Sequence, residues 1–159
     1  MKTIVLIRHA KSSWKDITLD DFSRPLNKRG KQNLPVMAEH LKNQNLAIEK
    51  IFSSSAKRAK KTAEEFSTQL GVSMQLDDSL YMASDMELLN FINDKLSKYN
   101  SIAIVSHNPG LTDLYNYISD DNIENIPTSG YVVLTNNKAK ISQNSTQLID
   151  FAYPKREDI

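Results

Sequence analysis

Arg8 and His9 directly follow an apolar stretch of the sequence, residues 3–7, in which isoleucine, valine and leucine predominate. A continuous apolar run of this length is typical of a strand that is buried on both faces of a parallel sheet. In open α/β sheets, ligands bind just beyond the carboxyl ends of the strands. We therefore expect the guanidinium and the imidazole to emerge at a ligand site, where the histidine could act as a nucleophile.

A second histidine and a second arginine follow two other predicted strands. His107 lies just beyond the apolar residues 101–105, and Arg58 comes a few residues after the short strand pattern of residues 50–53. If these strands are parallel neighbours of the first, two guanidiniums and two imidazoles converge on one edge of the sheet. They would form a pocket for a dianionic group, and the planar fork of arginine suits phosphate oxygens.

The paired arrangement argues against coincidence. A single histidine after a strand is more often a hydrogen-bonded structural residue, and we expect His40, in the middle of a predicted helix, to be one. The cluster of Lys57, Lys60 and Lys61 is likewise typical of a solvated helix face. Two histidines at strand ends, with arginines at two of these ends, instead predict an active site that binds an anion.

Phosphate is the anion that these residue types suit. The Asn-Pro-Gly turn at residues 108–110 is expected to open a helix and to aim its N–H groups and positive dipole end at the same place. One neutral imidazole could then attack phosphorus while a cationic partner stabilises charge on the equatorial oxygens. This chemistry needs neither a metal nor a cofactor, and the sequence has no carboxylate cluster at metal-binding spacing.

Strand and helix patterns along the chain predict how these residues are positioned. Strands are expected at residues 3–7, 50–53, 72–76 (an edge strand), 101–105, 131–135 and 147–151, with helices after Asn27, after residue 55, after Ser84 and over about residues 111–118. This order argues for an α/β fold. We expect a three-layer αβα sandwich whose central sheet is mostly parallel, with an added antiparallel part.

Local signals mark the ends of the first two helices. Asn27 is predicted to cap the first helix, and Pro35 inside that helix should kink it or shift its start. Ser54 or Ser55 is placed to cap the second helix, which Gly71 should end.

The remaining connections carry two further signals. Ser84 and Glu87 have the spacing of a capping box, and Pro109 suits the first position of the helix that follows it. Residues 11–25 lack clear periodicity and are predicted to form a long loop. Loops of this length inside a compact domain are uncommon and often functional.

Composition limits the class of protein. The 159 residues fit one domain, residues 1–159, and contain 40% hydrophobic and 25% charged residues, as in ordinary globular proteins. A net charge of +1 gives no support for nucleic-acid or membrane binding through bulk charge. The absence of cysteine excludes disulfides and thiolate sites, and no segment reaches the roughly 18 apolar residues of a membrane span. We expect a cytoplasmic protein; its oligomeric state is left open.

With these residues identified, the chain resembles the histidine phosphatase superfamily, the phosphoglycerate-mutase-like group with the Arg-His-Gly motif. More narrowly, it resembles the SixA-type phosphohistidine phosphatases. The matching segments follow the family order and span nearly the whole chain: residues 6–14, 21–30, 54–63, 80–84 and 106–110. The resemblance implies a phosphoglycerate-mutase-like fold and a phosphatase activity.

The resemblance also implies roles for individual residues. His9 would be the nucleophile that forms a phosphohistidine intermediate, Arg8 and Arg58 would grip the phosphoryl oxygens, and His107 would hydrogen-bond the phosphoryl group. The substrate-binding set is expected to include further residues at the rim of the pocket. These are Ser12, the backbone of Asn108, and Arg24, which could equally brace the loop.

The sequence departs from the family pattern at positions that bear on the substrate. Ala10 and Ser55 replace a usual glycine and proline, which looks tolerable. Where other branches of the family place an acidic general acid, this chain has Tyr81, with Asp85 as the nearest substitute. An alkoxide leaving group needs such an acid, which is worth roughly 10²–10⁴-fold in rate. Imidazole, with a pKa of about 6.5, can leave already protonated.

A site without a carboxylic acid therefore favours cleavage of a P–N bond. We expect a phosphatase that acts on phosphohistidine of a phosphocarrier or phosphorelay protein. A small-molecule phosphomonoesterase or a phosphoglycerate-mutase-like phosphotransferase remains the alternative within the enzyme class. A non-catalytic phosphate-binding module has less support, because the chain has only four glycines and no Gly-x-Gly-x-x-Gly after a strand.

Overall fold

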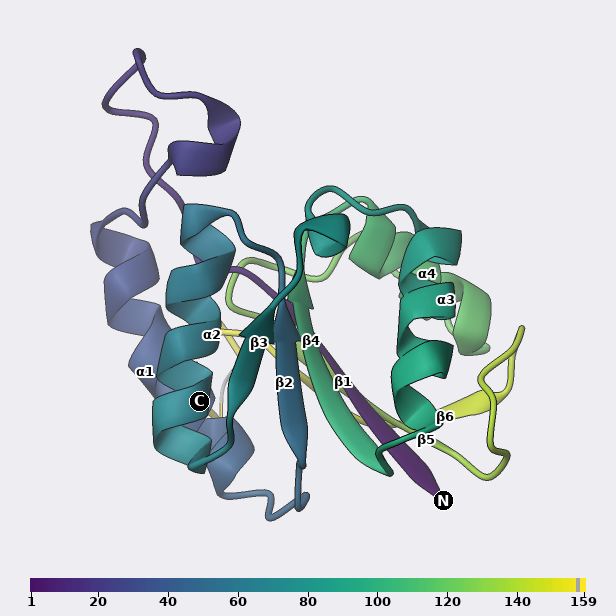
Figure 1. Ribbon diagram of the computed structural model, residues 1–159. Helices are drawn as coiled ribbons and strands as arrows, with labels where there is room; N and C mark the ends of the chain where they lie inside the picture. Colours follow the sequence, from purple (N-terminus) through teal and green to yellow (C-terminus); the bar gives the residue numbers. More distant parts are fainter. Residues whose placement is uncertain (157) are drawn as a thin grey trace.

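The computed structural model describes residues 1–156 and 158–159, and Figure 1 shows its α/β architecture. The strands are β1 (Lys2–Arg8), β2 (Lys50–Ser53), β3 (Met74–Leu76), β4 (Ser101–Ser106), β5 (Tyr131–Asn136) and β6 (Thr146–Ala152). The α-helices are α1 (Lys28–Lys42), α2 (Lys57–Leu70), α3 (Asp85–Leu96) and α4 (Gly110–Ile118). Two short 3-10 turns occupy Asp21–Ser23 and Asp78–Leu80.

The six strands form one mixed sheet in the order β3-β2-β4-β1-β5-β6. The first four strands of this order are parallel, while β5 runs antiparallel to both β1 and β6. In register, Arg8 is opposite Ser106 and Ser53 is opposite Val105. The carboxyl ends of β1, β2 and β4 therefore lie level, as the predicted convergence of their following residues requires. The expected parallel part, antiparallel part and edge strand β3 are confirmed.

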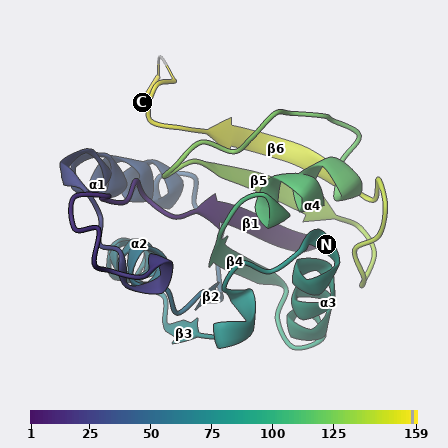
Figure 2. The same ribbon diagram turned by 90° about the horizontal axis from the view of Figure 1, so that it is seen from above.

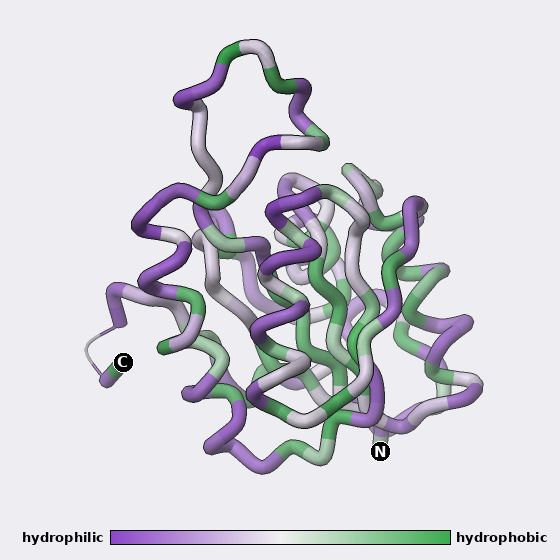
Figure 3. Tube along the Cα trace, turned by 60° about the vertical axis from the view of Figure 1, so that its left-hand side comes forward, coloured by the Kyte–Doolittle hydropathy of each residue, from purple (hydrophilic) through white to green (hydrophobic). Residues whose placement is uncertain are grey.

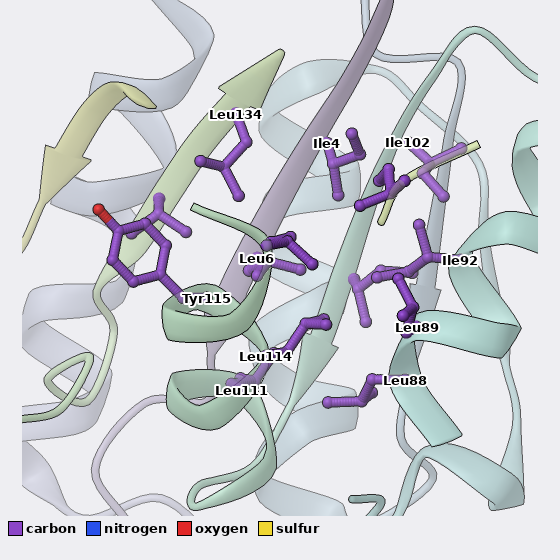
Figure 4. Close-up of a cluster of buried hydrophobic side chains, with 14 of the residues drawn as sticks. Ile4, Leu6, Leu88, Leu89, Ile92, Ile102, Leu111, Leu114, Tyr115 and Leu134 are labelled. Carbon is purple, nitrogen blue, oxygen red and sulfur yellow. The ribbon is translucent and has the colours of Figure 1, made fainter. Parts of the chain in front are cut away.

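Helices cover both faces of the sheet, as Figure 2 shows, with α1 and α2 on one side and α3 and α4 on the other. Successive residues of a strand point to opposite faces, so each buried strand feeds two cores. On one face, α3 and α4 pack against β1, β4 and β5 (Figure 4); this core includes Ile4, Leu6, Leu88, Leu89, Ile92, Ile102, Leu111, Leu114, Tyr115 and Leu134. The other face packs against α1 and α2 through Val5, Ile7, Met37, Leu41, Ala59, Ala63, Phe66, Ala103 and Val105.

Two of the predicted helix starts are confirmed. The Asn27 side chain caps α1 by accepting a hydrogen bond from the N–H of Gly30. Ser84 and Glu87 form the reciprocal capping box of α3. Pro35 lies inside α1 and does not shift its start; the predicted kink stays a prediction. The αL conformation of Gly71 ends α2, as expected.

Two other predicted helix starts are wrong. Ala56, without a side-chain hydrogen bond, is the N-cap of α2. The hydroxyl of Ser54 accepts from the N–H of Ala56 and also bonds to Nε2 of His107. Pro109 is the N-cap of α4 and not its first helical residue, so this helix begins at Gly110.

The predicted long loop leaves the sheet after β1 and returns at α1 (Figure 1). Its two arms join at the base, where Ser12 forms an isolated antiparallel bridge with Leu26, and the N–H of Asn27 donates to the carbonyl of Lys11. At this base α1 approaches the backbone so closely that a Cβ on Gly30 would overlap the carbonyl oxygen of Lys11. Within the described residues, no helix is long and apolar enough to cross a membrane.

The close approach at Gly30 generates a prediction for stability. The Gly30→Ala substitution should lower the free energy of unfolding by about 1–3 kcal/mol, because the backbone of Lys11 must move to admit the new methyl group. Urea denaturation measures this loss, with Lys31→Ala on an exposed neighbour as the control. Equal unfolding midpoints for Gly30→Ala and the unsubstituted protein would contradict the packing described above.

Candidate active site

The four residues singled out in the sequence converge on one pocket at the carboxyl edge of the sheet. Arg8 ends β1, His9 follows it, Arg58 lies in the first turn of α2 and His107 follows β4. All four line a pocket of about 280 Å³, and the centroids of the two imidazole rings are 5.1 Å apart. The predicted convergence of these side chains is therefore found in the structure.

The hydrogen bonds of His9 define which ring nitrogen carries the proton. Nδ1 lies 2.7 Å from the carbonyl oxygen of Ala10, which can only accept, so Nδ1 is the protonated nitrogen. Nε2 lies 3.3 Å from Nε of Arg58, which can only donate. The N–H of Ala10 donates to the hydroxyl of Thr62, which fixes the turn after β1 against α2. The free lone pair of His9 is therefore on Nε2.

His107 is oriented by the same reasoning. Its Nδ1 lies 3.3 Å from Nη2 of Arg58 and must accept, so Nε2 carries the proton and donates to the hydroxyl of Ser54 at 2.8 Å. Ser54 is fully buried at the end of β2. Sequence reasoning assigned it to a helix cap and missed this orienting contact, because the contact joins residues 53 positions apart.

Both imidazoles are uncharged near neutral pH. Burial lowers the pKa of His9 to about 3, and the guanidinium of Arg58 adds to this effect. Burial, followed by the proximity of His9 and Arg58, lowers the pKa of His107 to about 3 as well. A neutral imidazole has a lone pair that can attack phosphorus, whereas an imidazolium has none.

Arg58 connects both histidines to a carboxylate that sequence reasoning missed. The arginine is 3% exposed, and its remaining donors reach the carbonyl oxygen of Asp21 at 2.6 Å and Oδ2 of Asp21 at 2.9 Å. Oδ1 of Asp21 accepts from Arg24, and the hydroxyl of Tyr81 donates to Oδ2 at 2.6 Å. Asp21 lies in the long loop, where no periodic pattern pointed to it.

The site therefore contains a carboxylate that sequence reasoning did not identify, but Asp21 is held in its ionised form and not as a carboxylic acid. Burial would raise the pKa of Asp21, yet the hydrogen bonds from Tyr81 and Arg58 outweigh this effect and hold the pKa well below its usual range. The same hydrogen bond, together with burial, raises the pKa of Tyr81. Asp85, the other suggested acid, accepts from the backbone N–H of Met86 and does not line the pocket.

Arg8 presents an unused donor to the site. Its Nη1 donates to the carbonyl of Ile126, while its Nε is buried and has no hydrogen-bond partner among the described residues. A buried polar group without a partner is costly, so this N–H is suited to an anion that enters the pocket.

The three rim residues line the pocket and also have structural contacts. Arg24 donates to the hydroxyl of Ser12 and to Asp21, and its guanidinium stacks 3.5 Å from the centroid of the Trp14 ring. Arg24 thus braces the loop, one of its two suggested roles. The side chain of Asn108 donates to the carbonyl of Ile126 and accepts from Thr112 in α4. Substrate contacts of Ser12, Arg24 and the Asn108 backbone stay predictions.

Residues outside the site behave as ordinary structural groups. His40 accepts or donates a hydrogen bond with the hydroxyl of Tyr131 at 2.6 Å, on the α1 side of the sheet. Within residues 1–156 and 158–159, no group of three or more histidine, aspartate or glutamate side chains could hold a metal ion. The cationic side chains that line the pocket are Arg8, Lys11, Arg24 and Arg58.

The low pKa values of the two histidines predict their behaviour in a pH titration. Because the pKa of each native imidazole lies at about 3, both rings of His9 and His107 should stay unprotonated between pH 5 and pH 8. Proton NMR of the imidazole carbons, assigned with His9→Asn and His107→Asn variants, measures this directly. In concentrated urea the same signals should titrate near a pKa of about 6.5. A native midpoint near 6.5 would contradict the buried, neutral pair.

Comparisons with known proteins agree with this fold. The family model of the histidine phosphatase superfamily (branch 1) matches residues 4–81. A crystal structure of SixA from Agrobacterium tumefaciens is 28% identical with a TM-score of 0.83, covering 96% of this chain and 98% of that one. A structure of the protein histidine phosphatase SixA in complex with tungstate also has a TM-score of 0.83, at 20% identity, covering 96% of this chain and 97% of that one.

One curated relative is an uncharacterized chloroplastic protein of Arabidopsis thaliana. It is 28% identical over an alignment of 134 residues, and the match covers 77% of this chain. The chain covers 62% of the length of that relative. The family match over residues 4–81, the SixA-like fold and the Arg-His pair after β1 support one assignment for this chain: the histidine phosphatase superfamily, and within it the SixA type.

Proposed function

We propose that the chain, acting as one phosphatase domain, hydrolyses phosphohistidine on a protein through a phosphoryl intermediate on His9. The observation that carries this proposal is the pair of buried, neutral imidazoles, 5.1 Å apart, whose inner nitrogens both face the guanidinium of Arg58. A nucleophile, a neighbouring hydrogen-bonding ring and a cation then surround the place of one phosphoryl group. Phosphoryl transfer requires mainly such positioning and charge stabilisation.

In the first step, the lone pair on Nε2 of His9 attacks phosphorus. A P–N bond forms to His9 as the P–N bond to the substrate's imidazole breaks. The electron pair of the broken bond stays on the departing nitrogen, and because the other ring nitrogen carries a proton, the substrate ring leaves as neutral imidazole. Arg58 and the unused Nε of Arg8 hold the equatorial oxygens, whose charge rises in the transition state. In the second step water attacks the phosphoryl group on His9, which releases inorganic phosphate and restores the neutral imidazole.

Arginine side chains take the part that metal ions play in many phosphoryl-transfer enzymes. His107, oriented by Ser54, lies beside the transferred group and can exchange a hydrogen bond with it. Ser12, Arg24 and the backbone of Asn108 are proposed as contacts at the rim of the pocket, since each of these residues lines it.

The state of Asp21 supports a leaving group that needs no general acid. Its carboxylate receives hydrogen bonds from Arg58, Arg24 and Tyr81, so it is ionised at neutral pH and has no proton to give. An alkoxide released from a sugar phosphate would lack a donor here, whereas an imidazole with a pKa of about 6.5 needs none. The site is therefore better suited to a P–N bond than to a P–O bond.

The related structures support the same substrate class. SixA from Agrobacterium tumefaciens is named as a candidate phosphohistidine phosphatase, and the tungstate complex is that of a protein histidine phosphatase. Tungstate, like phosphate, is a tetrahedral oxyanion. That the substrate is a phosphorylated protein, and that the chain works in the cytoplasm, stay predictions for this chain.

A comparison of substrates tests the proposal. We expect the protein to hydrolyse a histidine-phosphorylated phosphocarrier protein and free phosphohistidine, with kcat/KM at least about 10²-fold above that for p-nitrophenyl phosphate or sugar phosphates, because only the P–N substrates leave without acid assistance. The measurement is release of inorganic phosphate. His9→Asn should abolish turnover of every substrate, while Tyr131→Phe, a change outside the pocket, should leave it intact.

A clear preference for sugar phosphates over phosphohistidine would contradict this substrate class and favour the phosphomonoesterase alternative. Asp21 would then have to act as a proton donor, and Asp21→Asn would abolish turnover of the sugar phosphates. Binding of phosphate without turnover of any of these compounds would instead identify a non-catalytic phosphate-binding protein.

A further inference from the structure

The active-site pocket is too small to hold more than the reacting part of a substrate. Its volume of about 280 Å³ is just below the range of roughly 300–1,000 Å³ that is typical of sites for drug-sized ligands. A phosphoryl group and one imidazole ring fit such a space. Whatever carries the phosphohistidine must therefore lie outside, against the rim of the pocket.

Apolar side chains are concentrated on one part of this rim. We call residues 13–25 the rim loop; Figure 1 shows it projecting beyond the ends of α1 and α2, and Figure 3 shows hydrophobic segments along it. Trp14 lines the pocket and is 72% exposed, and Ile17, farther along the loop, is 93% exposed. Leu19 and Phe22 are exposed on the same loop, and Met82 is 51% exposed on the pocket wall.

Single exposed apolar residues are normal on protein surfaces, but a group beside a binding pocket marks an interaction site. Trp14 and Met82 line the pocket itself, and Ile17, Leu19 and Phe22 extend this apolar surface along the rim loop. Their burial under a partner would be favourable by about 25 cal/mol for each Å² of apolar surface covered. A free sugar phosphate or amino acid is too small to cover them, whereas a protein surface is not.

The rim loop is held in one conformation before any partner binds. Asp21 anchors it to Arg58 of α2, the guanidinium of Arg24 stacks on Trp14, and the ring of Phe22 meets Tyr81 edge to face at 5.1 Å. Its two arms are joined by the hydrogen bond from the N–H of Ser13 to the carbonyl of Pro25. A surface that is already ordered loses little conformational entropy on binding, which favours affinity.

A cationic hollow adjoins the active-site pocket. A second hollow of about 450 Å³ shares Arg8 and Lys11 with the active-site pocket, and it is also lined by Arg29 of α1 and by Lys155 near the end of the chain. No carboxylate is among the described residues that line this hollow. A partner that covers the entrance thus meets both the apolar side chains of the rim loop and the positive charge of the adjoining hollow.

From this arrangement we propose that the rim loop and the cationic hollow form the docking surface for the phosphorylated protein substrate. The partner presents its phosphohistidine between an apolar patch, which covers Ile17, Leu19 and Phe22, and an acidic patch, which faces Arg29 and Lys155. Charge complementarity of this kind speeds association and fixes orientation. The proposal rests on the proposed function, since it concerns the carrier of the same phosphoryl group.

A comparison of a large and a small substrate tests the apolar part of the docking surface, the rim loop. The double substitution Ile17→Ser/Leu19→Ser should lower kcat/KM for a histidine-phosphorylated phosphocarrier protein about tenfold or more, mainly through KM, because these side chains would lie at the interface. It should leave hydrolysis of free phosphohistidine within about twofold, because neither residue lines the pocket. The matched control Leu148→Ser/Ile149→Ser, on exposed residues of β6, should change neither rate.

The charged part of the docking surface, the cationic hollow, is tested in the same assay. Arg29→Glu, at the start of α1, should lower kcat/KM for the phosphocarrier protein about tenfold and weaken its dependence on ionic strength. Lys42→Glu makes the same change of charge at the other end of α1 and should have no such effect. Circular dichroism and unfolding midpoints of all variants show that each one folds.

The outcomes separate the docking surface from the proposed function. If the unsubstituted protein cleaves both P–N substrates and the loop variant still cleaves the phosphocarrier protein equally well, the docking proposal is wrong and the function stands. If the unsubstituted protein cleaves neither P–N substrate, both are wrong. Sedimentation velocity gives a third outcome: self-association that the loop variant abolishes would make the rim loop a contact between copies of this chain and overturn its assignment to the substrate.

Discussion

The guanidinium of Arg58 donates toward one nitrogen of each active-site histidine, at 3.3 Å in both cases, and the state of the site depends on this sharing. Because arginine has no acceptor, each of those nitrogens must carry a lone pair and no proton. The other nitrogen of each ring must then donate, and it finds the carbonyl of Ala10 in one case and the hydroxyl of Ser54 in the other. A single buried cation thus sets two tautomers and keeps both rings neutral.

The sheet makes this sharing possible, and the rim loop balances the positive charge of the arginines. β1, β2 and β4 end level with one another, so residues that are distant in sequence meet around one guanidinium. Arg8 and Arg58 bring positive charge into a buried space, and Asp21 supplies a carboxylate at the entrance. A phosphoryl group would add negative charge and would supply the hydrogen-bond acceptor that the buried Nε of Arg8 lacks. The same aspartate that neutralises Arg58 also anchors the rim loop, which ties the catalytic chemistry to the surface beside it.

Much of this arrangement could be predicted from the sequence, because its signals are local. Apolar runs predicted the buried strands, and their positions directly after these runs singled out Arg8, His9 and His107. Asn27 marked the start of α1. The contributions of Ser54 and Asp21 could not be predicted in this way. Ser54 matched a helix-cap pattern but bonds to a histidine on another strand, and Asp21 lies in a loop whose position over α2 depends on tertiary contacts. Local patterns describe elements, whereas these two contacts join elements.

The central claim is that His9 receives the phosphoryl group, and rapid-quench mass spectrometry tests it most directly. The protein is mixed with a histidine-phosphorylated phosphocarrier protein, quenched in base within milliseconds to seconds and digested, and the peptide that contains His9 is analysed. The account predicts an added phosphoryl group on His9 that is stable in base and lost in acid, and that is absent from the His9→Asn variant. Steady release of phosphate with no phosphoryl group on His9 at any time, together with full turnover by His9→Asn, would contradict it.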